Sequence, residues 1–117
     1  MSTMTKCRRR HRRHRFAPGA DASVRFVYPQ PNGADIDRPL VDISTAGFSF
    51  TWSDELAGLD DGASVEGATI HIGGCEIRGE LTIMHTADGT SCGALFHPAT
   101  DEDLVRLKTI IAGMDSL

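Results

Sequence analysis

Residues 75–84 read CEIRGELTIM, and this stretch indicates the fold more clearly than any other part of the chain. Its odd positions are apolar or small, whereas its even positions from 76 to 82 are charged or hydroxyl-bearing. A period of two is the pattern of a β-strand with one face in the core and the other in water. The same alternation recurs, over shorter lengths, in residues 24–28, 48–52, 68–72 and 92–96.

Turn signals separate these runs. Gly73-Gly74 and residues 87–90 (ADGT) each fit a hairpin turn, and Asn32-Gly33 lies among prolines that mark an earlier one. Short strands with tight turns and one polar face each are typical of an antiparallel barrel. We therefore predict a mainly β fold, in which about six antiparallel strands form a barrel.

The period changes near the C-terminus, where a helix is predicted over about residues 100–114. Its apolar residues fall on one helical face: Leu104, Leu107, Ile110, Ile111 and Met114. Thr100 suits the N-cap, and Asp103 three residues later resembles a capping box. This helix is expected to cover part of the barrel.

The charges of the chain are unevenly distributed. Residues 1–16 carry seven Lys or Arg and no Asp or Glu, so their charge is +7, whereas residues 17–117 carry −11. Dense like charge with almost no apolar residues predicts a flexible arm over 1–16, attached to a single domain over 17–117. Such an arm is expected to attract an anion, or to fold back on the acidic domain until an anion competes for it.

Several classes of protein are not supported. No apolar run approaches the roughly 18 residues of a membrane span, and no apolar stretch follows the basic N-terminus, so we expect a cytoplasmic protein. Cys7, Cys75 and Cys92 are odd in number and lack a CxxC pair, which argues against disulfides and a cysteine zinc site. His11 and His14 are not favoured as metal ligands, because the surrounding charge is positive. No P-loop, nucleophile elbow or zinc helix is present, so no enzyme and no cofactor is predicted.

Two features remain as candidates for a site. One is the arginine-rich stretch over residues 8–15, and the other is DISTAG at residues 42–47. Each has a simple structural explanation when it is taken alone. Dense arginine is often a solvated basic tail, and Asp, Ser and Gly commonly form turns.

Taken together, the two features resemble the signature of the PilZ family, an RxxxR motif followed about thirty residues later by [D/N]xSxxG. Arg9 and Arg13 match the first motif, and Asp42, Ser44 and Gly47 match the second without a mismatch. Residues 92–96 (CGALF) also resemble the Gly-x-x-Phe strand that precedes the last helix of that family. The resemblance covers most of residues 8–112.

The arginines are dense enough to fit RxxxR in two registers, Arg8 with Arg12 or Arg9 with Arg13. We prefer Arg9 with Arg13, because family members often read Arg-Arg-Arg-His-x-Arg, as residues 8–13 do. The register itself stays open at this point.

The resemblance implies a six-stranded antiparallel barrel with a C-terminal helix, and cyclic di-GMP as the ligand. The residues that it implies as ligand-binding are Arg8, Arg9, Arg13, Asp42, Ser44 and Gly47. The chemistry fits, because a guanidinium can bind the O6 and N7 acceptors of guanine or a phosphate bidentately. A carboxylate can accept from guanine N1–H and N2–H₂, a serine can add a hydroxyl contact, and a glycine allows close approach.

We therefore expect a cyclic di-GMP receptor in which the ligand bridges the arm and the barrel and creates a surface for a protein partner. In the family such partners act in motility, pili or exopolysaccharide synthesis. Two alternatives remain: a PilZ-like interaction module without a ligand, and an arm that binds nucleic acid or another anion by itself. Nucleic acid is not favoured, because the charge of −11 on residues 17–117 repels an extended polyanion.

Overall fold

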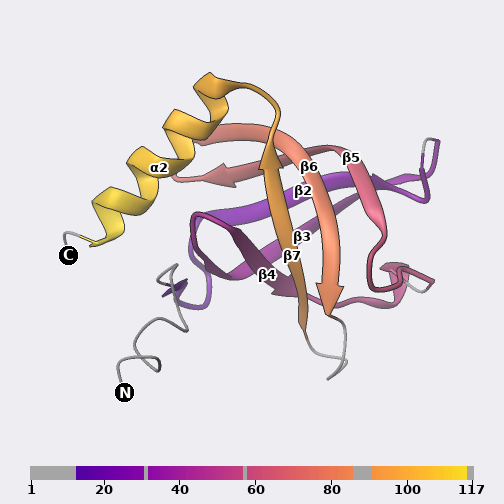
Figure 1. Cartoon of the computed structure of the whole chain (residues 1–117). Coiled ribbons are helices and arrows are strands. Elements are labelled where there is room, and N and C mark those ends of the chain that lie inside the picture. Colours follow the sequence, from indigo (N-terminus) through magenta and orange to yellow (C-terminus); the bar gives the residue numbers. More distant parts are fainter. Residues whose placement is uncertain (1–12, 31, 57, 86–90, 116–117) are drawn as a thin grey trace, which may run out of the picture.

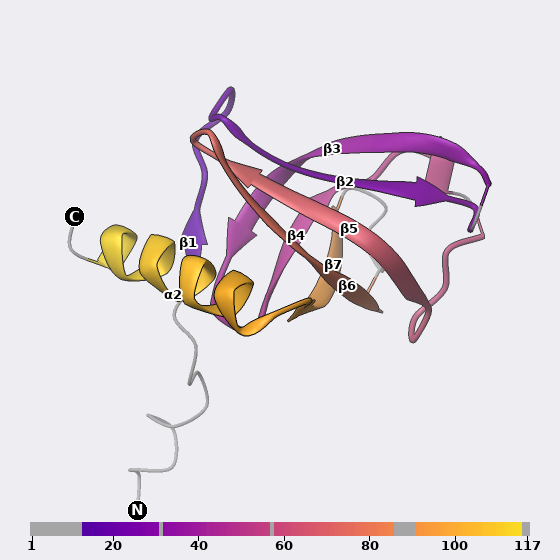
Figure 2. The same ribbon diagram turned by 90° about the horizontal axis from the view of Figure 1, so that it is seen from above.

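The strands close into a barrel in the computed structural model, which describes residues 13–30, 32–56, 58–85 and 91–115. The sheet order is β1-β3-β2-β5-β6-β7-β4, and β3 also pairs with β4. The pairing of β3 with β4 closes the six antiparallel strands from β2 through β7 into a barrel (Figures 1 and 2), as predicted. The strands are β1 (His14–Arg15), β2 (Ala22–Tyr28), β3 (Ala34–Ile43), β4 (Gly47–Thr51), β5 (Ser64–Ile72), β6 (Cys75–His85) and β7 (Ser91–Pro98). A short 3₁₀ helix, η1 (Asp54–Leu56), follows β4, and α2 (Asp101–Asp115) ends the described chain.

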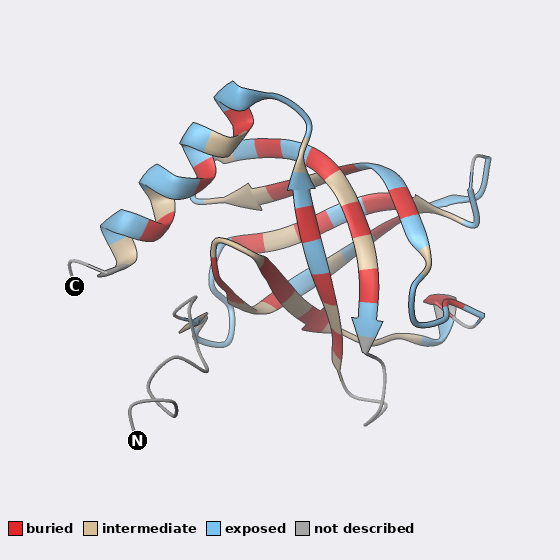
Figure 3. Ribbon diagram, viewed as in Figure 1, coloured by how far each residue is buried: buried red, intermediate tan, exposed pale blue. Residues whose placement is uncertain are grey.

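The core lies inside the barrel and follows the predicted alternation. On β6, Ile77, Leu81 and Ile83 are fully buried, and buried residues alternate with more exposed ones along the strands (Figure 3). Gly79 belongs to the same inward face, where an added Cβ would lie 2.6 Å from the ring of Phe96. The glycine is therefore needed because the backbone carbonyl of His97 and the ring of Phe96 occupy the space that a side chain would fill.

Phenylalanines from three strands fill the centre of the core. Phe26 of β2 meets Phe50 of β4 edge-on, with ring centroids 5.9 Å apart. Phe48 lies at the same distance from Phe96 of β7. Edge-on and tilted ring contacts of this kind are favourable beyond the area they bury. They link β2, β4 and β7 through the core.

The alternation of apolar and polar residues in the sequence predicted β2, β4, β5, β6 and β7, but it did not predict β3. In β3 the buried residues are Ile36, Leu40 and Ile43, so the spacing changes from even to odd within the strand. The cause is a β-bulge: Leu40 pairs with Phe50 but Asp42 pairs with Ser49, so one extra residue lies on β3. A strand whose period shifts in the middle gives no clean alternation signal.

The C-terminal helix agrees with its prediction. Leu107 and Ile111 of α2 are buried, and Ile110 and Met114 pack at the edge of the core. The helix contacts β6 and β7 and extends past the end of the barrel (Figure 1). Its apolar face is thus the surface that covers the barrel.

The start of α2 is tied to the barrel by Asp103. The Thr100 hydroxyl donates to Asp103 Oδ2 at 2.7 Å and accepts from the Asp103 backbone N–H at 3.1 Å. Asp103 Oδ1 also accepts from the backbone N–H of Arg78 on β6 at 3.1 Å. The Thr100 hydroxyl therefore caps the helix, and the Asp103 carboxylate orients that hydroxyl and joins the helix to a strand.

Residues 13–16 were predicted to be part of a flexible arm, but the structure places residues 14–16 against the barrel. His14 and Arg15 form β1, which pairs with Ile43 and Asp42 of β3. The Phe16 backbone N–H donates to the carbonyl of Val41 at 2.9 Å, and its side chain packs against the core. The backbone pairing and the apolar ring hold this short segment on the barrel in spite of its charge. Residues 1–12 lie outside the described residues.

The two cysteines of the described residues are free thiols. Cys92 is buried, and burial together with the nearby charge of Asp61 raises the pKa of its thiol to about 11. Cys75 is half-buried, and both thiols are free. Among the described residues, no cluster of His, Cys, Asp and Glu could hold a metal ion, and no helix is long and apolar enough to cross a membrane.

Substituting Asp103→Ala is expected to lower the free energy of unfolding by about 1–2 kcal/mol, because the capping Thr100 hydroxyl loses the carboxylate that orients it and the Arg78 N–H is left unpaired. The hydrogen bonds from Thr100 and Arg78 lower the pKa of Asp103. Its contribution is therefore present above the unfolded value of about 3.9 and is lost as the pH falls through the lower folded value.

Urea unfolding at pH 7 and at about pH 3 checks this prediction. The difference between wild type and Asp103→Ala should shrink on acidification. Asp101→Ala is the matched control, because Asp101 is an exposed acidic residue in the same helical turn. A difference that stays constant with pH would contradict the assigned role of the carboxylate.

Candidate functional site

Asp42 is brought to the outer surface of the barrel by the bulge in β3. Leu40 faces the core, and two residues further along a regular strand Asp42 would face the core as well. The extra residue, Val41, reverses the alternation, so Asp42 lies outside opposite Ser49 while Ile43 lies inside opposite Phe48. The bulge therefore avoids an unpaired carboxylate in the core and presents it on the surface.

Arg13 meets Asp42 directly. Arg13 Nη1 donates to Asp42 Oδ1 at 2.7 Å, and the Ser49 hydroxyl donates to the same oxygen, also at 2.7 Å. The Arg13 side chain is 43% exposed and that of Asp42 is 18% exposed, so the pair lies at the surface. Pairing of β1 with β3 is what brings the arginine to this position.

Ser44 is part of the turn that follows Asp42. It is 2% exposed, and its Oγ accepts from the backbone N–H groups of Ala46 and Gly47 at 3.2 and 3.3 Å. Its own backbone N–H donates to the carbonyl of Gly47 at 2.8 Å. The serine hydroxyl thus holds the β3–β4 turn in shape, as Ser does in many turns.

Gly47 is required by the close approach of two strands. A Cβ at this position would overlap the carbonyl oxygen of Ala94 on β7 and lie 3.0 Å from the Cα of Leu95. Both atoms belong to the backbone of β7, which cannot move aside for a Cβ as the end of a flexible side chain could. The last motif position therefore lets β4 lie directly against β7, beside Asp42.

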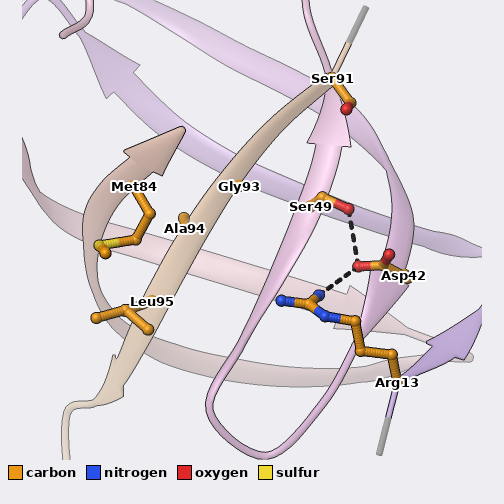
Figure 4. Close-up of a pocket in the computed structure, with 8 residues that line it drawn as sticks. All are labelled: Arg13, Asp42, Ser49, Met84, Ser91, Gly93, Ala94 and Leu95. Atoms are coloured by element: carbon orange, nitrogen blue, oxygen red, sulfur yellow. Dashed lines mark hydrogen bonds and ion pairs between the residues drawn. The ribbon is translucent and has the colours of Figure 1, made fainter. Parts of the chain in front are cut away.

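An open pocket of about 290 Å³ lies on the outer face of β4, β6 and β7, next to these residues. Figure 4 shows Arg13, Asp42 and Ser49 on one side of it and Met84 and Leu95 on the other. Gly93 and Ala94 lie between the two sides, and because Ala94 is buried in the core, the middle of the pocket is formed mainly by the backbone of β7. The pocket therefore has a polar side, an apolar side and little side-chain bulk in the centre.

Of the predicted site residues, the structure brings Arg13 and Asp42 into contact although 29 positions separate them. Ser44 and Gly47 lie in the adjoining turn, with the hydroxyl of Ser44 engaged inside it. Arg8, Arg9 and Arg12 lie outside the described part of the chain, whereas Arg13 lies within it. The choice between the two RxxxR registers therefore stays a prediction.

The sequence analysis did not identify Ser49, Met84, Ser91, Gly93, Ala94 or Leu95 as pocket residues. Ser49 had a usable signal, because it is a polar outward position between Phe48 and Phe50, whose rings are inside. The others required knowledge of which strands are neighbours. That information is absent from periodicity, which gives the face of a strand but not its partners.

Solved structures with the same fold include proteins that contain a PilZ domain. The K. pneumonia MrkH–c-di-GMP complex superposes with a TM-score of 0.80 at 21% identity over 92% of this chain and 51% of that chain. The PilZ domain of Escherichia coli YcgR with c-di-GMP gives 0.74 at 15% identity, over 93% and 92% of the two chains. Bacillus subtilis MotI, an inhibitor of motility, gives 0.65 at 16% identity, over 93% and 52%.

These likenesses establish a PilZ-like fold. The chain spans about half the length of MrkH and of MotI, and almost the whole of the YcgR PilZ domain. No protein-family model and no curated protein matches the sequence.

Substituting Gly47→Ala is expected to lower the free energy of unfolding by about 1–3 kcal/mol, because the added methyl group overlaps the backbone of β7. Gly113→Ala is the control, since a Cβ there meets nothing within 4 Å. In the helix it should raise stability by up to about 1 kcal/mol. Urea unfolding measures both, and equal effects in the two variants would show that the close approach at Gly47 is not constraining.

Proposed function

We propose that this domain is a receptor for cyclic di-GMP that binds the dinucleotide at the Arg13–Asp42 pocket and does not turn it over. The observation that carries the proposal is the contact between Arg13 and Asp42, which joins the two separate motifs at the wall of an open pocket. The PilZ-like fold supports it, because MrkH and YcgR adopt that fold in complexes with c-di-GMP. MrkH is described as a transcription regulatory factor and MotI as an inhibitor of motility, which supports signalling rather than catalysis.

The two residues suit opposite edges of a guanine base. A guanidinium donates in pairs to O6 and N7, and a carboxylate accepts from N1–H and N2–H₂. In the free domain they bind each other, so the ligand has to compete with the ion pair. An exposed ion pair contributes only about 0–1 kcal/mol, and this one is partly exposed, so exchange with the ligand costs little.

Ser44 and Gly47 act on the ligand through Asp42 in this proposal. The hydroxyl of Ser44 is engaged in the turn, and Gly47 packs against β7, so both hold the end of β3 in position. A direct contact of Ser44 or Gly47 with the ligand stays a prediction. Their role here is to fix the place from which the carboxylate reaches the pocket.

The arm supplies the remaining charge. Arg8 and Arg9 bind the phosphates of the ligand, while Arg13 already lies at the pocket. Binding fixes the arm against the acidic barrel and so creates a surface that a protein partner recognises. We place the receptor in the cytoplasm, in keeping with the free thiols of Cys75 and Cys92.

Titration calorimetry with cyclic di-GMP at moderate salt tests the proposal, with GMP and cyclic di-AMP as comparison ligands. Wild type should bind cyclic di-GMP saturably and in preference to the other two. Arg13→Ala and Asp42→Ala should each weaken binding by about ten- to a hundredfold, the worth of a hydrogen bond to a charged group.

Arg25→Ala and Asp37→Ala are the matched controls. They remove a second exposed arginine–aspartate pair, with 3.9 Å between the charged atoms, on β2 and β3 away from the pocket. Both should retain wild-type affinity. Weak binding of all three nucleotides that is insensitive to Asp42→Ala and declines steeply with salt would instead indicate an arm that binds anions without reading a base.

A further inference from the structure

The apolar side of the pocket is unusual for the surface of this domain. Among the described residues, the exposed large hydrophobic side chains are Met84, Leu95 and Val105, with 50%, 37% and 61% of their surface exposed. Two of these three, Met84 and Leu95, line the same pocket. Val105 lies apart from them on α2. Exposed apolar side chains that gather at a pocket indicate a surface that something covers.

Met84 lies on β6 where that strand has a second β-bulge. Ile83 pairs with Ala94 and His85 pairs with Gly93, so Met84 is the extra residue on β6. Ile83 is fully buried while Met84 is half exposed, so the alternation of β6 points the methionine away from the core. Bulges are common at the rims of barrels and next to functional sites.

We propose that Met84 and Leu95 form the wall against which the flat face of one guanine base packs, while Asp42 and Arg13 bind the edge of that base. This inference rests on the proposed function and assigns the base of the ligand, not its phosphates, to this pocket. Neither residue belongs to the RxxxR or the [D/N]xSxxG motif.

The shape of the pocket carries the assignment. A purine needs an apolar surface for its face and polar partners for its edge, and the two sides of this pocket supply one each (Figure 4). Gly93 has no side chain, and Ala94 is buried in the core, so a ring can lie between the two sides. Methionine is flexible and polarisable, and it adapts to the face of a ring better than a rigid side chain does. A phosphate gains nothing from such a wall, because burying its charge against apolar groups is costly.

Calorimetric titration with cyclic di-GMP tests the wall through the double variant Met84→Ala/Leu95→Ala. Affinity should fall by about tenfold, which corresponds to the loss of roughly two buried methylene groups. Met84→Leu, which keeps an apolar side chain, should bind within about threefold of wild type. Val105→Ala is the control for loss of an exposed hydrophobic residue elsewhere, and it should bind like wild type.

Methyl NMR gives a readout that a purely structural role would not change. In wild type labelled at the methionine methyl groups, the Met84 signal should move upfield when cyclic di-GMP is added, because it lies over the face of the base. Inorganic phosphate at the same concentration should leave it in place. The signal is assigned by its absence in Met84→Leu, and thermal unfolding of the double variant establishes that it is folded.

The outcomes separate the two proposals. If wild type does not bind cyclic di-GMP, the proposed function fails and the wall fails with it. If wild type binds but the double variant binds equally well and the Met84 methyl signal does not move, the receptor stands and the wall is overturned. In that case the apolar side would be available to a protein partner instead of the base.

Discussion

One extra residue in β3 supports both the architecture and the site. Val41 is unpaired in the ladder between β3 and β4, and that ladder is the pairing that closes the barrel. Because Val41 shifts the alternation, Leu40 and Ile43 both reach the core although their spacing is odd. The same shift turns Asp42 outward. A regular strand would leave either a buried carboxylate or an exposed isoleucine, and both are unfavourable.

The site is therefore coupled to the stability of the barrel. Asp42 lies one residue before the end of β3, Ser44 shapes the following turn, and Gly47 begins β4 where that strand lies against β7. The carbonyl of Val41 accepts from Phe16, which secures the segment that carries Arg13. Residues that look like parts of a ligand site in the sequence thus divide into two kinds. Arg13 and Asp42 are presented to the pocket, whereas Ser44 and Gly47 hold the backbone that presents them.

The two sides of the pocket arise in different ways. The bulge at Val41 turns Asp42 outward on the polar side, whereas Met84 and Leu95 on the apolar side are outward positions of the alternation of β6 and β7. Between them β4 and β7 pair in regular register, with Ser49 opposite Gly93. A small barrel has its interior filled by its own core, so a ligand site has to be built on its outer face. Irregular pairing is an effective way to gather unlike side chains there, because it changes where a side chain points without opening the core.

Local pattern in the sequence determined five of the six barrel strands and the C-terminal helix with its Thr100–Asp103 cap. These features depend on neighbours along the chain, through period, capping and turn chemistry. Arg13 and Asp42 were indicated by the resemblance of two short motifs to the PilZ signature. Only the tertiary structure decided that β3 is a bulged strand, that residues 13–16 join the barrel, and that Ser49, Met84 and Leu95 share a pocket with Arg13. The physical reason is that strand pairing and bulges depend on contacts between distant segments, and periodicity records which face a residue occupies but not which strand lies beside it.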